Sequence, residues 1–392
     1  MDLSEVPKVE VGELLKHADV GEPVLLLDVR NDADFARWKL EGRKPLDTVH
    51  VPYFAFIEDE DQALAKLPKD RDIVVVCASG DSSEMIAEMI NAKGMTAKNV
   101  AGGMVAYGNY LQPVQVPLKP QEEGRFEIWQ LNRRGKGCLS YVIRAKDEAI
   151  LVDPSRDDEQ YEAFLKQLGA RLVHVLDTHV HADHKSGGPE IAEKHGVPYT
   201  VTAGGDFELK KKITPLEDGA ALRLGGEHGV RVVVQAVKTP GHTPGSTSYL
   251  IGERYLLSGD TLFVQSVGRP DLGGQVVEWG KSLYHTLKER IAALEDDTVV
   301  LPAHYADVSE IGEDGIVSGR LGDLRRTVSE LKIENEADFV EAMRQAVTDP
   351  PPTYADIIKI NLGVLDVPDE KIAEWELGKN ECAAKAVRKQ AQ

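Results

Sequence analysis

Continuous runs of apolar residues alternate with helical patterns in the N-terminal part of the chain. Val24–Val29 and Ile73–Cys77 are two such runs, and strands that are apolar on both faces are typical of a parallel sheet covered by helices. After the second run, Ser83–Ile90 has apolar residues at helical spacing, and Gly94 is a suitable residue to end that helix. This pattern predicts a small α/β domain over residues 1–112.

The apolar pattern changes after a proline-rich stretch. Residues 113–124 contain three prolines and show no clear period, which is typical of a linker. Several strand-like runs follow, beginning with residues 126–129, and a second strand-rich region ends near His304. From residue 319 onward the pattern is mainly helical. We therefore expect a second, larger α/β domain over residues 125–392.

One loop of this second domain is rich in histidine and aspartate. The strand-like run Leu172–Asp177 leads directly into Thr178–His184, and a helical pattern begins at Pro189. Loops between a strand and a helix are a usual place for chemistry in layered α/β folds. Three histidines and one aspartate lie within this loop, and burying them all as neutral core groups would be costly. A divalent metal would give all of them one common partner.

Three further candidate ligands follow the ends of later strand-like runs. His242 lies in a turn rich in glycine and proline, while Asp260 and His304 each come directly after an apolar run. The complete candidate set is His179, His181, Asp183, His184, His242, Asp260 and His304.

This ordered set resembles the motifs of the metallo-β-lactamase superfamily: His-x-His-x-Asp-His, a distal Gly-His, an aspartate and a final histidine. The resemblance implies an αββα sandwich with a helical C-terminal extension for residues 125–392. Asp260 separates the branches of the superfamily, because the best-known zinc β-lactamases carry cysteine at that position. With aspartate at this position, the chain resembles the glyoxalase II and persulfide dioxygenase branch.

The ligand set alone leaves two metal centres open. Resemblance to persulfide dioxygenases implies one Fe(II) per chain, held by His179, His242 and Asp260, a face that suits non-haem iron and O₂. Resemblance to glyoxalase II implies two zinc ions per chain that activate a bridging water. Four candidates remain, namely His181, Asp183, His184 and His304. They support the single iron in the first case and bind the second metal in the other. Asp183 is also a candidate catalytic residue.

A short segment after Asp260 favours the oxidative branch. Gly268-Arg269-Pro270-Asp271 resembles the Gly-Arg-x-Asp element that follows the aspartate ligand in persulfide dioxygenases. Arg269 is accordingly a candidate catalytic residue that binds a substrate carboxylate or orients Asp260 by a charge-assisted hydrogen bond.

Cys77 follows an apolar strand and opens a tight loop before a helix. Its thiol is expected to face backbone N–H groups and the positive end of the helix dipole, which favour the reactive thiolate. This loop, with Leu27–Arg30 and Val100–Met104, resembles a rhodanese domain, and the resemblance implies that Cys77 carries sulfane sulfur. Ala78 and Asp81 depart from the family, in which an arginine in the loop often holds thiosulfate.

The other two cysteines lack such a setting. Cys138 lies near the start of a strand-like run, where core packing is the expected role, and Cys382 lies in a polar tail. Three widely spaced thiols do not form a disulfide framework, and they fit a reducing cytoplasm. The sequence begins without a secretory signal pattern and contains no apolar run long enough to span a membrane.

The net charge of −19 excludes nucleic acid as an expected partner, because phosphate binding needs clustered Lys and Arg. The expected partners are O₂ and a small persulfide or thiol resembling glutathione, and a homo-oligomer is compatible with the sequence. A rhodanese domain joined to a persulfide dioxygenase would raise the effective concentration of a shared sulfur intermediate.

The leading hypothesis is oxidation of glutathione persulfide, or another low-molecular-weight persulfide, to sulfite by this fused enzyme. The first alternative is a binuclear zinc hydrolase that cleaves a thioester. The second is a sulfur relay or partner-binding protein with a vestigial metal site.

Overall fold

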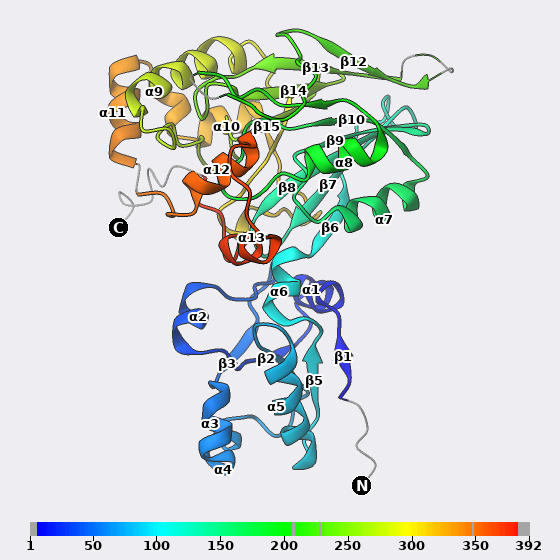
Figure 1. The fold of residues 1–392 in the computed structure, drawn as a ribbon, viewed down its shortest axis with the longest axis vertical. Helices are drawn as coiled ribbons and strands as arrows, with labels where there is room; N and C mark the ends of the chain where they lie inside the picture. Colours follow the sequence, from blue (N-terminus) through cyan, green and yellow to red (C-terminus); the bar gives the residue numbers. More distant parts are fainter. Residues whose placement is uncertain (1–5, 206–207, 227–228, 230, 347–348, 383–392) are drawn as a thin grey trace. The chain divides into compact units, whose positions relative to one another are not determined.

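The computed structural model describes residues 6–205, 208–226, 229, 231–346 and 349–382, so Val230 and the last ten positions of the expected helical tail lie outside the described residues. The chain divides into two compact units (Figure 1). The first contains Met1–Gln112, Arg133–Lys136 and Leu377–Lys379. The second contains Pro113–Asn132, Gly137–Glu376 and Asn380–Gln392.

The first unit is built on a five-stranded parallel sheet with the order β1-β5-β4-β2-β3. The two apolar runs of the sequence form its central strands. The strands are β1 (Lys8–Val9), β2 (Leu25–Asp28), β3 (Asp47–His50), β4 (Ile73–Val76) and β5 (Ala97–Val100). Successive side chains of a strand point to opposite faces, so Leu25 and Leu27 enter one core and Leu26 enters the other. Continuous apolar runs are therefore required here.

Helices cover both faces of this sheet. Ile86 of one helix belongs to the core that contains Leu27, and Leu14 of another belongs to the core that contains Leu26. The helices of the unit are α1 (Val11–Val20), α2 (Asp32–Arg37), α3 (Tyr53–Glu58), α4 (Glu60–Leu64), α5 (Asp81–Ala92) and α6 (Gly103–Asn109). Gly94, expected to end α5, follows the helix with a left-handed φ of 81°.

The second unit contains two six-stranded sheets packed face to face, with the orders β11-β10-β9-β8-β7-β6 and β12-β13-β14-β15-β16-β17. The first consists of β6 (Leu111–Gln115), β7 (Glu127–Arg133), β8 (Cys138–Ala145), β9 (Glu148–Val152), β10 (Arg171–Leu176) and β11 (Tyr199–Thr200). The second consists of β12 (Ala221–Leu224), β13 (Val232–Lys238), β14 (Thr247–Ile251), β15 (Tyr255–Gly259), β16 (Val299–Pro302) and β17 (Gly319–Arg320). One apolar core joins them, with Tyr141 from the first sheet and Tyr249 from the second.

Helices lie on the outer faces of this sandwich. Figure 1 shows α7 and α8 beside β9 and β10, and a second apolar core joins Leu283 and Phe339 to Leu256 of β15. The helices are α7 (Asp158–Leu168), α8 (Gly188–His195), α9 (Val276–His285), α10 (Leu321–Thr327), α11 (Glu336–Ala346), α12 (Tyr354–Leu362) and α13 (Asp369–Trp375). The expected fold class is confirmed: a small α/β domain, an αββα sandwich and a helical C-terminal segment. Within the described ranges, no helix has the length and apolar character needed to cross a membrane.

The segment expected to be a linker is partly built into the sandwich. Its first residues belong to β6, and the N–H of Val116 donates to the Ile128 carbonyl oxygen at 2.8 Å. Val116 is buried in the sandwich core. The proline content suggested irregular backbone, but β6 is an edge strand, where the missing N–H of Pro113 costs no central ladder bond. The linker predicted from composition therefore includes residues that belong to the sandwich.

Candidate metal centre

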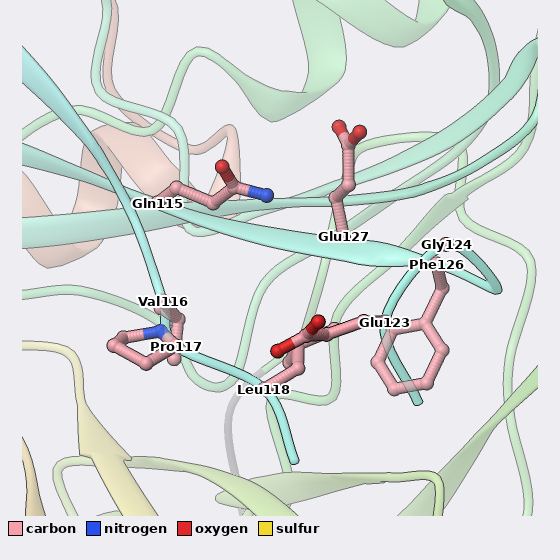
Figure 2. A pocket seen from close by; sticks show the side chains of 8 residues that line it. All are labelled: Gln115, Val116, Pro117, Leu118, Glu123, Gly124, Phe126 and Glu127. Carbon is pink, nitrogen blue, oxygen red and sulfur yellow. The ribbon is translucent and has the colours of Figure 1, made fainter. Parts of the chain in front are cut away.

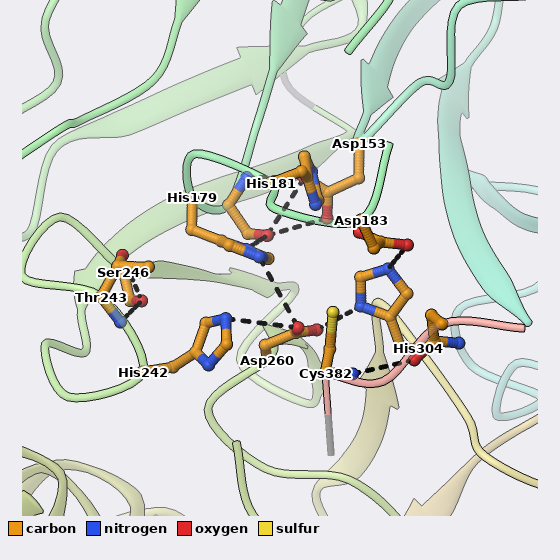
Figure 3. A network of polar contacts seen from close by, with 12 residues as sticks. Asp153, His179, His181, Asp183, His242, Thr243, Ser246, Asp260, His304 and Cys382 are labelled. Carbon is orange, nitrogen blue, oxygen red and sulfur yellow. Dashed lines mark hydrogen bonds and ion pairs between the residues drawn. The ribbon is translucent and has the colours of Figure 1, made fainter. Parts of the chain in front are cut away.

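The candidate ligands meet where strands of the two sheets of the second unit end. The loop after β10 carries His179–His184, and the segments after β13, β15 and β16 carry His242, Asp260 and His304. Figure 3 shows His179, His242, Asp260 and His304 converging from separate loops. Each of the candidate histidines and aspartates is at most 1% exposed. The sequence set is thus brought together in one buried site.

His179, His242 and Asp260 form one group, with ligand atoms all within 4.8 Å of one another. Asp260 Oδ2 lies 3.6 Å from His179 Nε2 and 3.4 Å from His242 Nε2. The other ring nitrogen of His242, Nδ1, donates to the Arg269 carbonyl oxygen at 2.9 Å. Because a carbonyl only accepts, Nδ1 carries the proton, and the lone pair of Nε2 faces Asp260.

The hydroxyl of Thr178 fixes His179 in the same way. Thr178 Oγ1 donates to Asp153 Oδ2 at 2.9 Å, so it accepts from His179 Nδ1, also at 2.9 Å. His179 Nε2, His242 Nε2 and Asp260 Oδ2 are buried and have no hydrogen-bond partner among the described residues. Leaving such atoms unpaired costs about 1–3 kcal/mol each. Two imidazole lone pairs and a carboxylate oxygen are suitable ligands for a divalent transition metal, so these residues fit one.

The remaining candidates divide between two further groups. Cys138, Asp183, His184 and His304 offer a second set of ligand atoms within 4.8 Å of one another. In this set His184 Nδ1 lies 3.0 Å from Asp183 Oδ1, and His304 Nε2 lies 3.2 Å from Asp183 Oδ2. His304 Nδ1 also bonds Asp260 Oδ1 at 2.6 Å, which links the second group to the first.

His181 instead joins Asp153, a residue that the sequence reasoning missed. His181 Nε2 lies 3.1 Å from Asp153 Oδ1, and the N–H of Thr178 donates to the same oxygen at 2.6 Å. Asp153 follows β9 and has a φ of 52°, a left-handed conformation that is unusual for a residue other than glycine. An aspartate directly after an apolar run was the available signal, as it was for Asp260.

The charges of the two groups differ. Burial lowers the pKa of His179 and of His242 below the usual imidazole value. Burial also opposes charge on His184, but Asp183 outweighs it and raises the pKa of His184 to about 10. The pKa of His304 is likewise raised well above its usual value against burial, by Asp183 and Asp260. In the metal-free site, the first group therefore contains neutral imidazoles and the second contains protonated ones.

Arg269 occupies a different role from the one expected. Its Nε donates to Asp271 Oδ1 at 2.7 Å and its Nη2 donates to Asp271 Oδ2 at 2.6 Å. The guanidinium therefore forms a bidentate ion pair with that carboxylate. The side chain is 2% exposed. Through its backbone carbonyl, Arg269 orients His242 rather than Asp260. Binding of a substrate carboxylate by Arg269 would require breaking its pair with Asp271.

Both remaining cysteines lie at the metal centre, contrary to expectation. Cys138 Sγ lies 3.1 Å from Asp183 Oδ2 and 3.9 Å from His184 Nδ1. Burial and Asp183 act to raise the pKa of Cys138, but His304 and His184 outweigh them and lower it. Cys382 is completely buried, and its thiol lies within 4.8 Å of a potential ligand atom of Asp260 and of one of His304. The polar composition of the tail gave no sign of this burial.

Cys77 lies in the first unit, in the loop between β4 and α5. The N–H of Gly80 donates to its Sγ at 3.1 Å, and Ser83 Oγ also lies 3.1 Å from Sγ. Cys77 itself is 5% exposed, and the adjacent Ala78 borders a hollow of about 90 Å³. The lining of this hollow also includes Arg30 and Arg37. The thiol therefore faces polar donors, and the neighbouring hollow is lined by two arginines and by Asp34.

A separate hollow of about 390 Å³ in the second unit is lined by residues of the segment before and at the start of β7 (Figure 2). Its lining contains the carboxylates of Glu123 and Glu127 and the ring of Phe126. None of the candidate ligands contributes to this hollow. We therefore place the chemistry at the buried ligand groups and not in the larger hollow.

Comparison with known proteins identifies both parts of the chain. A family model described as the metallo-beta-lactamase superfamily matches residues 133–304, and one described as the rhodanese-like domain matches residues 10–110. Human persulfide dioxygenase ETHE1, mitochondrial, is 30% identical over 193 residues, covering 47% of this chain and 71% of that protein. The chain belongs to the metallo-beta-lactamase superfamily. It also carries an N-terminal rhodanese-like domain, so both expected resemblances are confirmed.

Two other similar proteins represent different branches. The crystal structure of ETHE1 from Myxococcus xanthus is 25% identical, with a TM-score of 0.51, and the match covers 60% of this chain and 98% of that one. A hydroxyacylglutathione hydrolase from Acidiphilium cryptum is 33% identical over 170 residues, covering 43% of this chain and 65% of that protein. The relatives thus include a protein named as a dioxygenase and one named as a hydrolase.

Proposed function

We propose that this member of the superfamily is an iron-dependent persulfide dioxygenase. The observation that carries the proposal is the face of His179, His242 and Asp260, whose buried ligand atoms have no other partner in the described chain. Two histidines and one carboxylate are the ligand set of many non-haem Fe(II) oxygenases. The similarity to human persulfide dioxygenase ETHE1 supports the same choice.

A ferrous ion held by this face would supply the chemistry of O₂ activation. The chain's own residues would orient the ligands and keep water out. The Arg269 carbonyl and the Thr178 hydroxyl hold the two imidazoles with Nε2 toward Asp260. The near-complete burial of the group restricts access of bulk water, which would otherwise compete with the substrate.

The proposed substrate is glutathione persulfide or another low-molecular-weight persulfide. The balanced reaction is R–S–S⁻ + O₂ + H₂O → R–SH + SO₃²⁻ + H⁺. The S–S bond breaks, the terminal sulfur is oxidised to sulfite and O₂ is reduced. No external reductant is needed, because the terminal sulfur supplies all the electrons.

Oxygen consumption by iron-loaded protein with glutathione persulfide tests this function directly. We expect one sulfite to form for each O₂ consumed, and no O₂ uptake with glutathione alone. The metal-free protein is the control for spontaneous oxidation of the persulfide. Absence of O₂ uptake together with hydrolysis of a glutathione thioester would contradict the proposal.

The second candidate function is a binuclear zinc thioester hydrolase. It is favoured by the second ligand group, which contains Asp183, His184 and His304 and lies beside the first. The similarity to a hydroxyacylglutathione hydrolase points the same way. In that case two metals per chain would activate a bridging water.

The pH dependence of metal content is expected to separate the two functions. His179 and His242 have lowered pKa values, so they are neutral at pH 7 and bind a metal without losing a proton. His184, with a pKa of about 10, must lose a proton, as must His304. A second metal should therefore bind more weakly at neutral pH, and its affinity should rise about tenfold per pH unit for each proton displaced.

Metal analysis after equilibrium dialysis between pH 6 and pH 9 measures this difference. We expect one metal per chain at neutral pH and a second only as the pH rises. Two metals bound with equal affinity at pH 7 would contradict the one-metal assignment and favour the hydrolase.

We further propose that the rhodanese-like domain supplies sulfur to the dioxygenase reaction through Cys77. Replacing Cys77 with serine should leave O₂ consumption on added glutathione persulfide unchanged and abolish O₂ consumption that depends on thiosulfate and glutathione. The matched control is Ser79→Ala, an exposed position in the same loop that should retain both activities. Equal loss of both activities in Cys77→Ser would contradict this division of labour.

A further inference from the structure

The segment Asn380–Cys382 of the second unit reaches the metal centre from the C-terminal part of the chain. Cys382 is 0% exposed, although the residues before it were expected to form a polar tail. Figure 3 shows its sulfur next to Asp260 and His304. Neither the family motifs nor the matched region, which ends at residue 304, includes this cysteine.

Hydrogen bonds hold each residue of this segment in place. The Asn380 side chain donates to the carbonyl oxygens of Gly137 and Tyr305, both at 3.1 Å. The Glu381 N–H donates to the Tyr354 hydroxyl at 2.7 Å. These anchors adjoin Cys138 and His304 in the sequence, so the segment is fastened to the same backbone that carries members of the second ligand group.

Arg269 fastens the segment from the side of the first ligand group. Its backbone N–H donates to the Cys382 carbonyl oxygen at 3.3 Å, and its Nη1 donates to the Glu381 carbonyl oxygen at 3.4 Å. The carbonyl of the same arginine orients His242. Arg269 therefore contacts both the C-terminal segment and one candidate metal ligand.

The thiol of Cys382 lies beside two candidate metal ligands. A ligand atom of Asp260, one of His304 and Sγ of Cys382 all lie within 4.8 Å of one another. Asp260 Oδ2 and His304 Nε2 are buried and make no hydrogen bond among the described residues. Sγ itself makes a long hydrogen bond, at 4.0 Å from the Tyr354 hydroxyl. Cys382 packs with Ala182 and Tyr354 in a small apolar cluster, and its thiol also adjoins two candidate metal ligands.

We propose that Cys382 is a thiolate ligand that the C-terminal segment contributes to the metal centre. The ion would be a transition metal such as iron or zinc, which thiolates bind well. On binding, Sγ forms a bond to the metal, and the thiol proton leaves to solvent without any change in oxidation state. The inference rests on the metal centre of the proposed function but not on its reaction.

The space next to the C-terminal segment is small compared with the proposed substrate. A neighbouring apolar hollow, lined by Ala182, Leu272 and Ile358 among others, has a volume of about 20 Å³. That is room for roughly one water molecule and not for a glutathione persulfide. As described, this hollow therefore does not accommodate the proposed substrate.

Zinc X-ray absorption spectroscopy of the full-length protein tests the ligand, without O₂ or persulfide. The chain contains three cysteines, so in the double variant Cys77→Ser/Cys138→Ser the single remaining thiol is that of Cys382. This variant, loaded with one equivalent of Zn²⁺ and dialysed free of small thiols, should show one sulfur scatterer at about 2.3 Å from zinc. The added change Cys382→Ser should remove it and leave nitrogen and oxygen ligands at about 2.0–2.2 Å.

Absence of sulfur from the zinc shell of the double variant overturns the proposal. If the double variant fails to fold or to bind zinc, the comparison is made between the unchanged protein and Cys382→Ser alone. Loss of one sulfur scatterer then supports the assignment, and an unchanged sulfur shell overturns it. Failure of the dioxygenase reaction would leave these spectra unaffected, so the two proposals are tested separately.

Discussion

Replacing Asp260 with alanine is expected to weaken metal binding by more than the factor of about 10–100 that is typical of residues supporting a metal site. The change removes the carboxylate whose Oδ2 lies within 3.6 Å of both His179 Nε2 and His242 Nε2. It also removes the partner that bonds His304 Nδ1 at 2.6 Å. Two neutral imidazoles then remain to hold a divalent ion without a negative charge. Metal analysis of freshly purified protein measures the loss.

Thermal unfolding gives an independent measure of the same variant. A ligand at 100 times its dissociation constant stabilises a protein by about 2.7 kcal/mol, so added metal should raise the Tm of the unchanged protein and not that of Asp260→Ala. The matched control is Asp28→Asn, which breaks a buried ion pair with Arg30 in the first unit. That variant should lose stability and keep its metal. If Asp260→Ala kept the metal content of the unchanged protein, the ligand assignment would be wrong.

The parts of the site that the sequence predicted share one physical feature. His179, Asp260 and His304 follow strands that end in buried residues, and the apolar residues of those strands make them recognisable. The ends of the strands are therefore visible in the sequence. The candidate ligands follow those ends in the order of a known motif, so their convergence needed no structural information.

The parts that were missed depend on contacts between distant segments. Asn380 bonds the carbonyl oxygen of Gly137, 243 positions earlier in the sequence, and neither residue has a periodic or motif context. Cys382 is buried by these contacts and not by any hydrophobicity of its neighbours. A polar segment anchored by hydrogen bonds to backbone has the same composition as an exposed one, so composition could not separate them.

Arg269 shows a different limit. Its motif pointed to a residue that contacts the candidate site, but a motif does not show which group a guanidinium binds. The carboxylate of Asp271, two residues later, already accepts hydrogen bonds from Nε and Nη2 of Arg269, so these donors are not available to a substrate. The backbone carbonyl of Arg269, which no sequence pattern represents, makes the bond to His242.

Replacing Gly268 with alanine is expected to lower both metal affinity and stability, although the change adds one methyl group. A Cβ at this position would overlap the carbonyl oxygen of Asp260 and lie 3.0 Å from Cβ of His242. Both neighbours are proposed ligands, and one of the overlapping atoms is backbone, which cannot rotate away. Relief requires a shift of the segment that carries Arg269 and its bond to His242. Overpacking of this kind typically lowers the free energy of unfolding by about 1–3 kcal/mol, and we expect a loss in this range.

Gly280→Ala is the matched control for Gly268→Ala. Gly280 lies in α9 of the same unit, and an added Cβ would come no closer than 3.6 Å to the Val340 side chain. Alanine is favoured over glycine inside a helix by about 1 kcal/mol, so this variant should keep its metal and unfold at the same or a higher temperature. Metal titration and thermal unfolding of both variants make the comparison. If Gly268→Ala bound metal as tightly as Gly280→Ala, the close packing of this segment against Asp260 and His242 would not control the ligand geometry, and the positioning role of Arg269 would fail with it.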